Sequence, residues 1–477
     1  MKKTNKTSVK AGYRVEHDSL GEMLVPNWAY WGAQTQRSMK NFQIADQIVS
    51  LDLIHAFGAV KHAAATANEK CGKLDHNRAR LIRQACEEIM AGKLDKHFPT
   101  NSYQAGAGTQ TNMNVNEVIA RRASKIAGKP GYVHENDHAN MSQSTNDAYP
   151  TSANLCAIYM VENKLLPALD RLIATYKRLE KEHANLVKLG RTHIQDAVPI
   201  TFGQEVSGWR FACENAREMI VRALDSLYVC TMGATAVGTG STCPLKKGYA
   251  KFCCDALNKV LKNNKHFSVA KEFRVVPNLF YSTWSKDALI FVHGAIKALA
   301  MNLYKISMDV RFLASGPRSG FGEINIPQNE PGSSIMPGKV NPTQCEGMSM
   351  MCVDVVGRDI VVAWLGGGAN FELNTFGTIQ FANFADSVNR FANYIDSFNK
   401  NCCAGITVNP KKMKYYVDNS LMLVTALKDV IGYHKSAEIA LYAQRNGLTL
   451  KEAAHKLGYI SEKDYDKYVV PAKMCHN

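Results

Sequence analysis

The sequence has no run of about five or six like charges, although its net charge is strongly positive. It contains 57 Lys and Arg residues against 42 Asp and Glu residues, which gives a formal net charge of +15. The basic residues are scattered, as at Arg121-Arg122, Lys246-Lys247 and Lys411-Lys412, so no basic arm is present. Steering of a small dianion therefore fits this charge better than binding of nucleic acid or of an anionic membrane.

The cysteines lack the two-residue spacing with which thiolates share a zinc ion or an iron-sulfur cluster. Most of the 13 cysteines lie in apolar stretches, and the pairs Cys253-Cys254 and Cys402-Cys403 are directly adjacent. This usage is typical of small buried side chains in a reducing compartment. We predict no metal site.

Signals for export or membrane insertion are also missing. Residues Met1–Lys10 are polar and lysine-rich without an apolar core, so they do not resemble a secretory signal, and they lack the arginines of a typical transit peptide. The longest apolar stretch, Ala288–Tyr304, is interrupted by polar residues that would be costly in lipid. We expect a cytoplasmic protein, or a mitochondrial one if a presequence has been removed.

Hydrophobic periodicity predicts five long helices. They cover residues 151–179, with a bend at Pro167, 203–230, 285–313, about 343 to the glycines at 366–368, and 380–400. Strand signals are few and do not alternate with helices. The chain is therefore predicted to be mainly α, with a central helix bundle.

Three parts are expected along the chain. Residues 1–148 are rich in glycine, asparagine and turn residues, residues 149–400 carry the long helices, and residues 401–477 form a small helical domain. No repeat or low-complexity linker separates them, so they should pack together. The five helices have more apolar surface than one subunit can hide, which predicts burial between chains.

The segment Gly332–Pro342 is the most informative loop. Its glycines and prolines allow it to flex at defined points, and it carries two serines, Lys339 and Asn341. Asn341, Pro342 and Gln344 are typical of a helix start with an N-cap, a first-turn proline and a capping-box partner. The positive end of that helix and Lys339 would suit an anion. Taken alone, the segment could also be an ordinary loop with a capped helix.

Three further segments are dense in groups that bind or move small charged species. Residues 106–114 and 142–147 are rich in hydroxyls and carboxamides, which bind a carboxylate without bringing a rival charge. Residues 190–196 add His193, and imidazole is well suited to proton transfer at neutral pH. Each segment could be turn chemistry alone. Their combination with the Gly332 loop favours an active site.

These motifs resemble the fumarase/aspartase superfamily. The resemblance is carried by Gly-Ala-Thr-Ala-Val-Gly-Thr-Gly at 233–240 and by the Gly332 loop, and it extends over residues 31–38, 329–331, 342–346 and 421–427. These flanking segments resemble class II fumarases specifically. The resemblance implies a mainly α, three-domain fold whose long helices form the core of a homotetramer. It also implies a cofactor-free lyase that hydrates fumarate reversibly to L-malate.

The resemblance implies a role for each candidate residue. Ser333 would take the proton from carbon, and Lys339 would help to stabilise the resulting aci-carboxylate. His193, oriented by Glu346, would handle water at the other carbon. The dicarboxylate would be held by Thr109, Asn112, Ser144, Thr145, Asn146, Thr192, Ser334 and Asn341. In this family three subunits supply these segments, so a monomer should be inactive.

A second anion site is implied more weakly. His134, Asn136, Asp137 and Asn140 resemble the family's accessory anion site, although Glu135 stands where a proline is usual.

Other positions depart from the fumarase pattern. Ala107 and Thr145 stand where serines are usual and resemble aspartate ammonia-lyases, and Gly377-Thr378 replace a basic residue and a proline. Aspartate ammonia-lyase, which forms the same carbanion but releases ammonia, therefore remains the alternative. A non-catalytic scaffold is disfavoured because Ser333, Lys339 and His193 are all present.

Overall fold

The computed structural model describes residues 11–244, 248–264 and 266–475. The expectations for Met1–Lys10 and for Lys246-Lys247 lie outside these residues. Contacts divide the chain into two compact units. Unit 1 comprises Met1–Pro167, Glu218–Lys297 and Asp354–Ala392, and unit 2 comprises Ala168–Arg217, Ala298–Val353 and Asn393–Asn477. The division into three domains at residues 148 and 400 stays a prediction.

Unit 1 is built mostly from helices that follow an N-terminal hairpin. Its elements are β1 (Tyr13–Asp18), β2 (Gly21–Pro26), α1 (Ala33–Asn41), α2 (Leu51–Lys70), α3 (His76–Met90), η1 (Asp95–His97), α4 (Thr109–Ile126), η2 (Glu135–Ala139), α5 (Thr145–Met160), η3 (Val161–Leu165), η4 (Asp225–Leu227), β5 (Val229–Cys230), α8 (Tyr249–Asn263), β6 (Arg274–Val275) and α9 (Leu279–Trp284). Helix α2 packs against α3, α5 and α8. It is buried along most of its length because its alanines let these helices approach closely.

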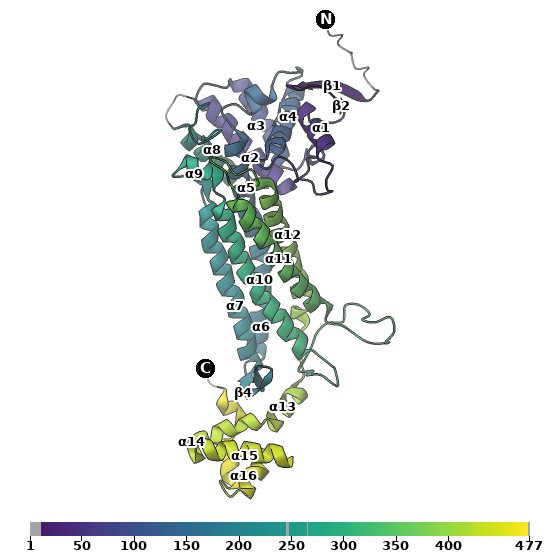
Figure 1. The fold of residues 1–477 in the computed structure, drawn as a ribbon, viewed down its shortest axis with the longest axis vertical. Helices are drawn as coiled ribbons and strands as arrows, with labels where there is room; N and C mark the ends of the chain where they lie inside the picture. The colour runs from purple at the N-terminus through teal and green to yellow at the C-terminus, as the bar shows by residue number, and fades with distance from the viewer. Residues whose placement is uncertain (1–10, 245–247, 265, 476–477) are drawn as a thin grey trace. The chain divides into compact units, whose positions relative to one another are not determined.

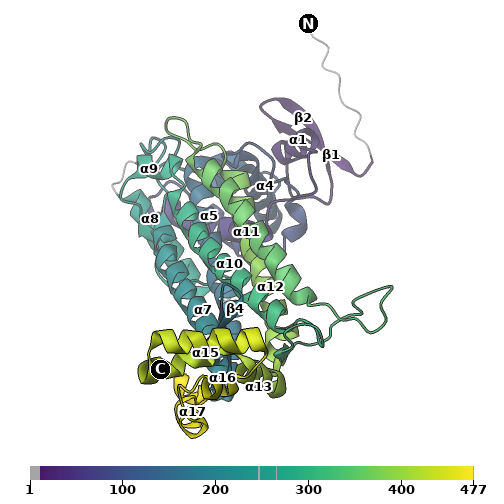
Figure 2. The same ribbon diagram turned by 60° about the horizontal axis from the view of Figure 1, so that its bottom comes forward.

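Five long helices each contribute residues to both units. They are α6 (Leu166–Glu182), α7 (Phe202–Leu224), α10 (Asp287–Leu313), α11 (Thr343–Gly367) and α12 (Gly377–Asn401). Figures 1 and 2 both show α10, α11 and α12 side by side. In unit 1, buried His293 of α10 pairs through Nδ1 with Asp359 of α11 and through Nε2 with Ser387 of α12, each at 2.9 Å. The predicted helix bundle is therefore confirmed.

The first predicted long helix is not continuous. Helices α5 and α6 are joined by η3, a π-helical turn at Val161–Leu165, rather than by a bend at Pro167 alone. Proline lacks the N–H that would donate to the carbonyl four residues earlier, at Asn163, and its ring crowds that carbonyl. The helix therefore widens in the turn that precedes the proline.

Helix α10 contains the longest apolar stretch predicted from the sequence. Among the described residues it is the one helix long and apolar enough to cross a membrane, and 50% of its most apolar window is buried inside the chain. In unit 2, its Asn302 Nδ2 donates to the Ala212 carbonyl of α7 at 3.2 Å, and its Ser307 lies 3.0 Å from Ser349 of α11. These contacts are those of a core helix in a bundle.

Unit 2 adds a hairpin and the C-terminal helices. Its elements are β3 (Val187–Thr192), β4 (Gln195–Thr201), β7 (Ile324–Asn325), η5 (Cys403–Gly405), β8 (Thr407–Val408), α13 (Pro410–Asn419), η6 (Leu421–Leu427), α14 (Lys428–Ile431), α15 (Tyr433–Asn446), α16 (Leu450–Lys456), α17 (Glu462–Tyr468) and η7 (Pro471–Met474). Figure 2 shows α15 and α16 close together. Leu427, Ile439 and Ala453 form their core, onto which Leu189 of β3 packs.

Candidate active site

A polar pocket of about 440 Å³ lies in unit 1. Five predicted substrate-binding residues line it: Thr109, Asn112, Ser144, Thr145 and Asn146. The remaining lining residues are the predicted accessory residue Asn140, with Met113, Gln143, Thr235, Ala236, Ser241 and Thr242. Among the described residues that line this polar pocket, the side chains are hydroxyls, carboxamides or apolar groups, and none is charged. Such a wall can donate hydrogen bonds to a carboxylate without holding a competing acid.

Two helix N-termini open onto the polar pocket. Helix α4 begins at Thr109 and helix α5 at Thr145, so their positive ends face the same space. Gly108 precedes α4 with φ of 87°, and a Cβ there would lie 2.1 Å from the ring of Tyr149. Glycine is therefore required, and it offers α4 no side-chain cap of its own, while the Gln104 carboxamide oxygen accepts the first-turn N–H of Thr111 at 2.9 Å. This arrangement favours an anion.

Buried Asp147 joins the two walls of the polar pocket. One carboxylate oxygen accepts the N–H of Ser144 at 2.9 Å, and the other accepts those of Gly233 and Thr235 at 3.2 and 2.9 Å. Burial raises the pKa of Asp147 to about 6, against the effect of these three donors. Asn146 adds a bond from Nδ2 to the Ala236 carbonyl at 2.8 Å. The 233–240 motif is thus fixed onto the start of α5.

Ser333 lies in unit 2, in the loop that leads to α11. Its Oγ accepts the backbone N–H groups of Ile335 at 3.2 Å and Met336 at 2.9 Å. The base of the loop is closed by a bond from the Gly332 N–H to the Lys339 carbonyl at 2.8 Å. Two donors on one hydroxyl oxygen would stabilise negative charge there, which a serine needs if it is to remove a proton.

The other polar residues of this loop have different environments. Lys339 and Ser334 are exposed, and among the described residues Lys339 has no ion-pair partner. Asn341 donates from Nδ2 to the Gly332 carbonyl at 2.6 Å, so it braces the loop. The prediction that Asn341 caps the helix is wrong, because α11 begins at Thr343 and Gln344 instead accepts a bond from Ser397 at 3.0 Å.

His193 stands at the tip of the β3–β4 hairpin. His193 and Ile194 are the two residues between the strands, with φ of 57° and 61°, and Thr192 pairs with Gln195. Two left-handed residues in a two-residue loop form a type I′ turn, whose twist matches that of the strands. His193 is exposed, and Ile194 is 69% exposed. The imidazole is therefore presented on a narrow projection.

A buried ionic network holds the base of this hairpin. Fully buried Glu323 forms an ion pair with Lys188 Nζ at 3.0 Å and accepts a hydrogen bond from Arg191 at 2.9 Å, and Lys188 donates to Glu205 at 2.7 Å. Burial raises the pKa of Glu205, opposed by Lys188. Removing one member would leave an unpaired buried charge, so the network fixes where the tip points.

Glu346 lies in the first turn of α11. Its carboxylate is 3.4 Å from Arg311, and no hydrogen bond joins it to His193 among the described residues of this single chain. The pairing of His193 with Glu346 stays a prediction that concerns an assembly of chains.

The four predicted accessory residues are separated by the structure. His134 accepts the N–H groups of Asn136 and Asp137 at 3.2 and 3.3 Å, so its ring caps η2. Asn140 instead belongs to the polar pocket, where its Oδ1 accepts a bond from Lys61 at 3.0 Å. The exposed side chains of this turn are those of His134, Asn136 and Asp137, and Asn140 ends the turn with its N–H on the Glu135 carbonyl at 3.0 Å.

Comparisons with known proteins identify the family. A family described as Lyase matches residues 21–357, and one described as Fumarase C C-terminus matches residues 423–476. The chain is 47% identical over 466 residues to a class II fumarate hydratase of Campylobacter jejuni, covering 97% of this chain and 98% of that protein. It is 45% identical, with the same coverage, to that of Helicobacter pylori. The chain belongs to the class II fumarate hydratase family.

A solved structure agrees with the class II fumarate hydratase fold. The crystal structure of recombinant class II fumarase from Schistosoma mansoni has a TM-score of 0.94 and 37% identity, and the match covers 98% of this chain and all of that one. The chain is accordingly a lyase with the mainly α fold predicted from the sequence. Among the described residues, no group of three or more His, Cys, Asp or Glu side chains is arranged to hold a metal ion.

Three buried residues that position this site were missed from the sequence. Lys61 and Glu323 lie far along the chain from the groups that they hold, and Asp147 joins the nearby Ser144 to the distant Thr235. Each looks like an ordinary helix or loop residue in the sequence. A charged residue within an apolar run, as in Ala-Val-Lys61-His-Ala, was the available signal for Lys61.

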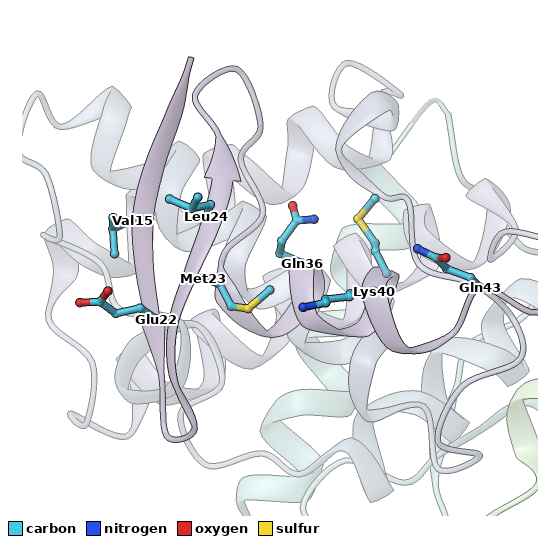
Figure 3. Close-up of a pocket in the computed structure, with 8 residues that line it drawn as sticks. Val15, Glu22, Met23, Leu24, Gln36, Lys40 and Gln43 are labelled. Carbon is cyan, nitrogen blue, oxygen red and sulfur yellow. The ribbon is translucent and has the colours of Figure 1, made fainter. Parts of the chain in front are cut away.

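A second cavity carries none of the predicted residues. It measures about 480 Å³ and lies between the β1–β2 hairpin and α1, with Val15, Leu24, Gln36 and Lys40 around it (Figure 3). Its wall offers one basic and one acidic side chain, Lys40 and Glu22, and no group of proton-transfer residues. We assign no chemistry to it.

Proposed function

We propose that this member of the class II fumarate hydratase family adds water to fumarate reversibly, giving L-malate. The observation that carries the proposal is the polar pocket at the N-termini of α4 and α5, whose described lining residues carry no charge and which suits a carboxylate group. The names of the relatives, fumarate hydratase class II, support the same reaction.

Removal of the carbon-bound proton is the difficult step in the direction from malate. The base would be Ser333, whose Oγ already accepts two N–H groups. Loss of the proton places a second negative charge on the neighbouring carboxylate, giving an aci-carboxylate. Lys339, Asn341 and loop N–H groups would stabilise it, an effect worth about 3 kcal/mol per donor in other enzymes.

Departure of the hydroxyl group completes the reaction. His193, with Glu346 as its orienting partner, would give a proton to the leaving hydroxide so that it departs as water, and in the reverse direction it would take a proton from the attacking water. Thr192 and Ser334, both exposed, would complete the binding of the dicarboxylate.

Assembly into a homotetramer is part of this proposal. Large apolar side chains are exposed on three long helices: Phe211 of α7, Phe291 of α10, and Met350 and Trp364 of α11 are 61–79% exposed. Contact between chains would bury them. It would also bring the exposed His193 tip, the Ser333 loop and the polar pocket together from different subunits. A cytoplasmic location, without nucleic-acid or membrane partners, belongs to the same proposal.

Aspartate ammonia-lyase is the second candidate. Thr145 lines the polar pocket, and Thr145 and Ala107 both resemble the residues of that enzyme. We therefore expect this wall to influence whether the leaving group is water or ammonia. Purified protein should produce the ultraviolet absorbance of fumarate from L-malate without added cofactor. Production from L-aspartate and not from L-malate would reverse the two candidates.

A further inference from the structure

A dicarboxylate dianion bound in the polar pocket would bring negative charge that the protein has to compensate. None of its described lining residues is charged, so the described part of this wall places no cation against a bound carboxylate. The helix N-termini supply part of the compensation. A cation placed just behind the wall would add to it.

Lys61 of α2 is such a cation. It is fully buried, with a relative exposure of 0%, and its Nζ donates to Asn140 Oδ1 at 3.0 Å. The same oxygen accepts Nδ2 of Asn112 at 3.2 Å and Nδ2 of Asn116 at 3.1 Å. Three donors therefore converge on one carboxamide oxygen, and two of the residues concerned, Asn112 and Asn140, line the polar pocket.

The hydrogen bonds to Asn140 Oδ1 determine the orientation of the Asn112 carboxamide. The buried Oδ1 of Asn112 has no hydrogen-bond partner among the described residues, so its bond to Asn140 is what orients the carboxamide. A carboxamide has two N–H donors, and the second one of Asn112 is left for a ligand. The Lys61 ammonium group thus determines the orientation of Asn140, which determines that of Asn112.

Burial of an ammonium group beside a single amide is unfavourable by itself. It lowers the pKa of Lys61 to about 7, opposed chiefly by the charge of Asp147. Asp147 already accepts three backbone N–H groups, and no hydrogen bond joins it to Lys61 among the described residues. A neutral side chain would fill the same space without the free-energy penalty of burying an ammonium group. The presence of a lysine therefore indicates a role other than packing.

We propose that Lys61 is a positioning residue of the polar pocket, which orients Asn140 and, through it, Asn112 for a bound carboxylate. This inference rests on the proposed function only in taking the ligand to be a dicarboxylate. A lysine that merely stabilised the fold would contribute to stability without affecting ligand affinity.

The test compares two variants that remove the charge in different ways. Lys61→Gln keeps a donor for Asn140 and removes the ammonium group. Lys61→Met keeps the length of the side chain and removes both the ammonium group and the donor to Asn140, so it tests the role of Lys61 even if Lys61→Gln fails to fold. Lys286→Gln is the control, because Lys286 is a half-buried lysine that donates to the Ser282 and Thr283 carbonyls, and neither residue lines the polar pocket.

In both test variants we expect the KM for L-malate and fumarate to rise about tenfold, with kcat changing less than about threefold, because Lys61 acts on binding rather than on the proton transfers. The increase in Tm caused by succinate should shrink in parallel. Lys286→Gln should lower Tm without changing KM. An unchanged KM and succinate response in a folded test variant would overturn the proposal. Because succinate is not turned over, the increase in Tm that it causes tests the role of Lys61 even if the wild-type protein fails to hydrate fumarate.

Discussion

The hydroxyl oxygen of Ser333 lies 2.9 Å from the backbone nitrogen of Met336, whose N–H it accepts. Together with the N–H of Ile335, this donor prepares the oxygen to carry negative charge. The Ser333→Ala variant should therefore lose about a thousandfold in kcat, since proton transfer by a positioned base contributes on this scale. Steady-state kinetics with L-malate measures the loss.

Ser461→Ala is the control for that variant. Ser461 also accepts a backbone N–H, from Asp464 at 3.1 Å, but it caps α17 in the C-terminal helices. This control should keep its activity and lose about 1 kcal/mol of stability. A Ser333→Ala enzyme of near-normal rate and normal assembly would remove Ser333 from the role of base.

Replacement of His193 can be made without disturbing its turn. Asn is among the residues that adopt positive φ most readily, so His193→Asn should keep the type I′ turn, in which His193 has φ of 57°. We expect kcat to fall about a hundredfold because the group that protonates the leaving hydroxide is lost. Circular dichroism and Tm should remain close to those of the wild type. Activity retained within about threefold would show that another group moves this proton.

The ionic network at the base of the hairpin gives a stability prediction. Glu323→Gln leaves Lys188 and Arg191 without their shared carboxylate in a buried site. The free energy of unfolding should fall by about 3 kcal/mol. The exposed pair between Arg178 and Glu182 provides the comparison, and Glu182→Gln should cost less than about 1 kcal/mol. Equal effects of the two substitutions, measured by urea denaturation, would show that the network does not act as a buried unit.

The partly buried His62 predicts acid sensitivity. Burial lowers its pKa from 6.5 to about 4, so the folded protein keeps the ring neutral while the unfolded chain protonates it. The unfolded state then binds more protons between these values, and stability is lost as pH falls from about 6.5 towards 4, by at most about 3 kcal/mol. Urea midpoints at several pH values should show this loss, and His62→Gln should reduce it. An unchanged pH dependence in the variant would assign the loss to other groups.

The helices were predictable because a buried helix face appears in the sequence as apolar residues at the helical spacing. The predicted helix over 285–313 corresponds to α10 within two residues, since its apolar side chains recur with the helical period. The π-helical turn at 161–165 was not predicted, because it depends on how the turn before Pro167 relaxes.

The polar pocket was predictable only in part. Its hydroxyl and carboxamide segments are visible in the sequence, but the residues that orient them are not. Asn140 was predicted at an accessory anion site, and the structure places it against Lys61, 79 positions away. Asn341 was predicted as a helix cap, and it braces the Gly332 carbonyl instead. An asparagine side chain can bond to its own neighbours in the chain or to a distant residue. Tertiary contacts determine which partner it takes, and sequence spacing does not reveal them.

Parallel assays of the purified protein with L-malate and with L-aspartate test the central claim most directly. The proposed fumarate hydratase activity predicts that the absorbance of fumarate appears with L-malate without added cofactor, and that little or none appears with L-aspartate. Turnover of L-aspartate with release of ammonia, and none of L-malate, would contradict the proposed function.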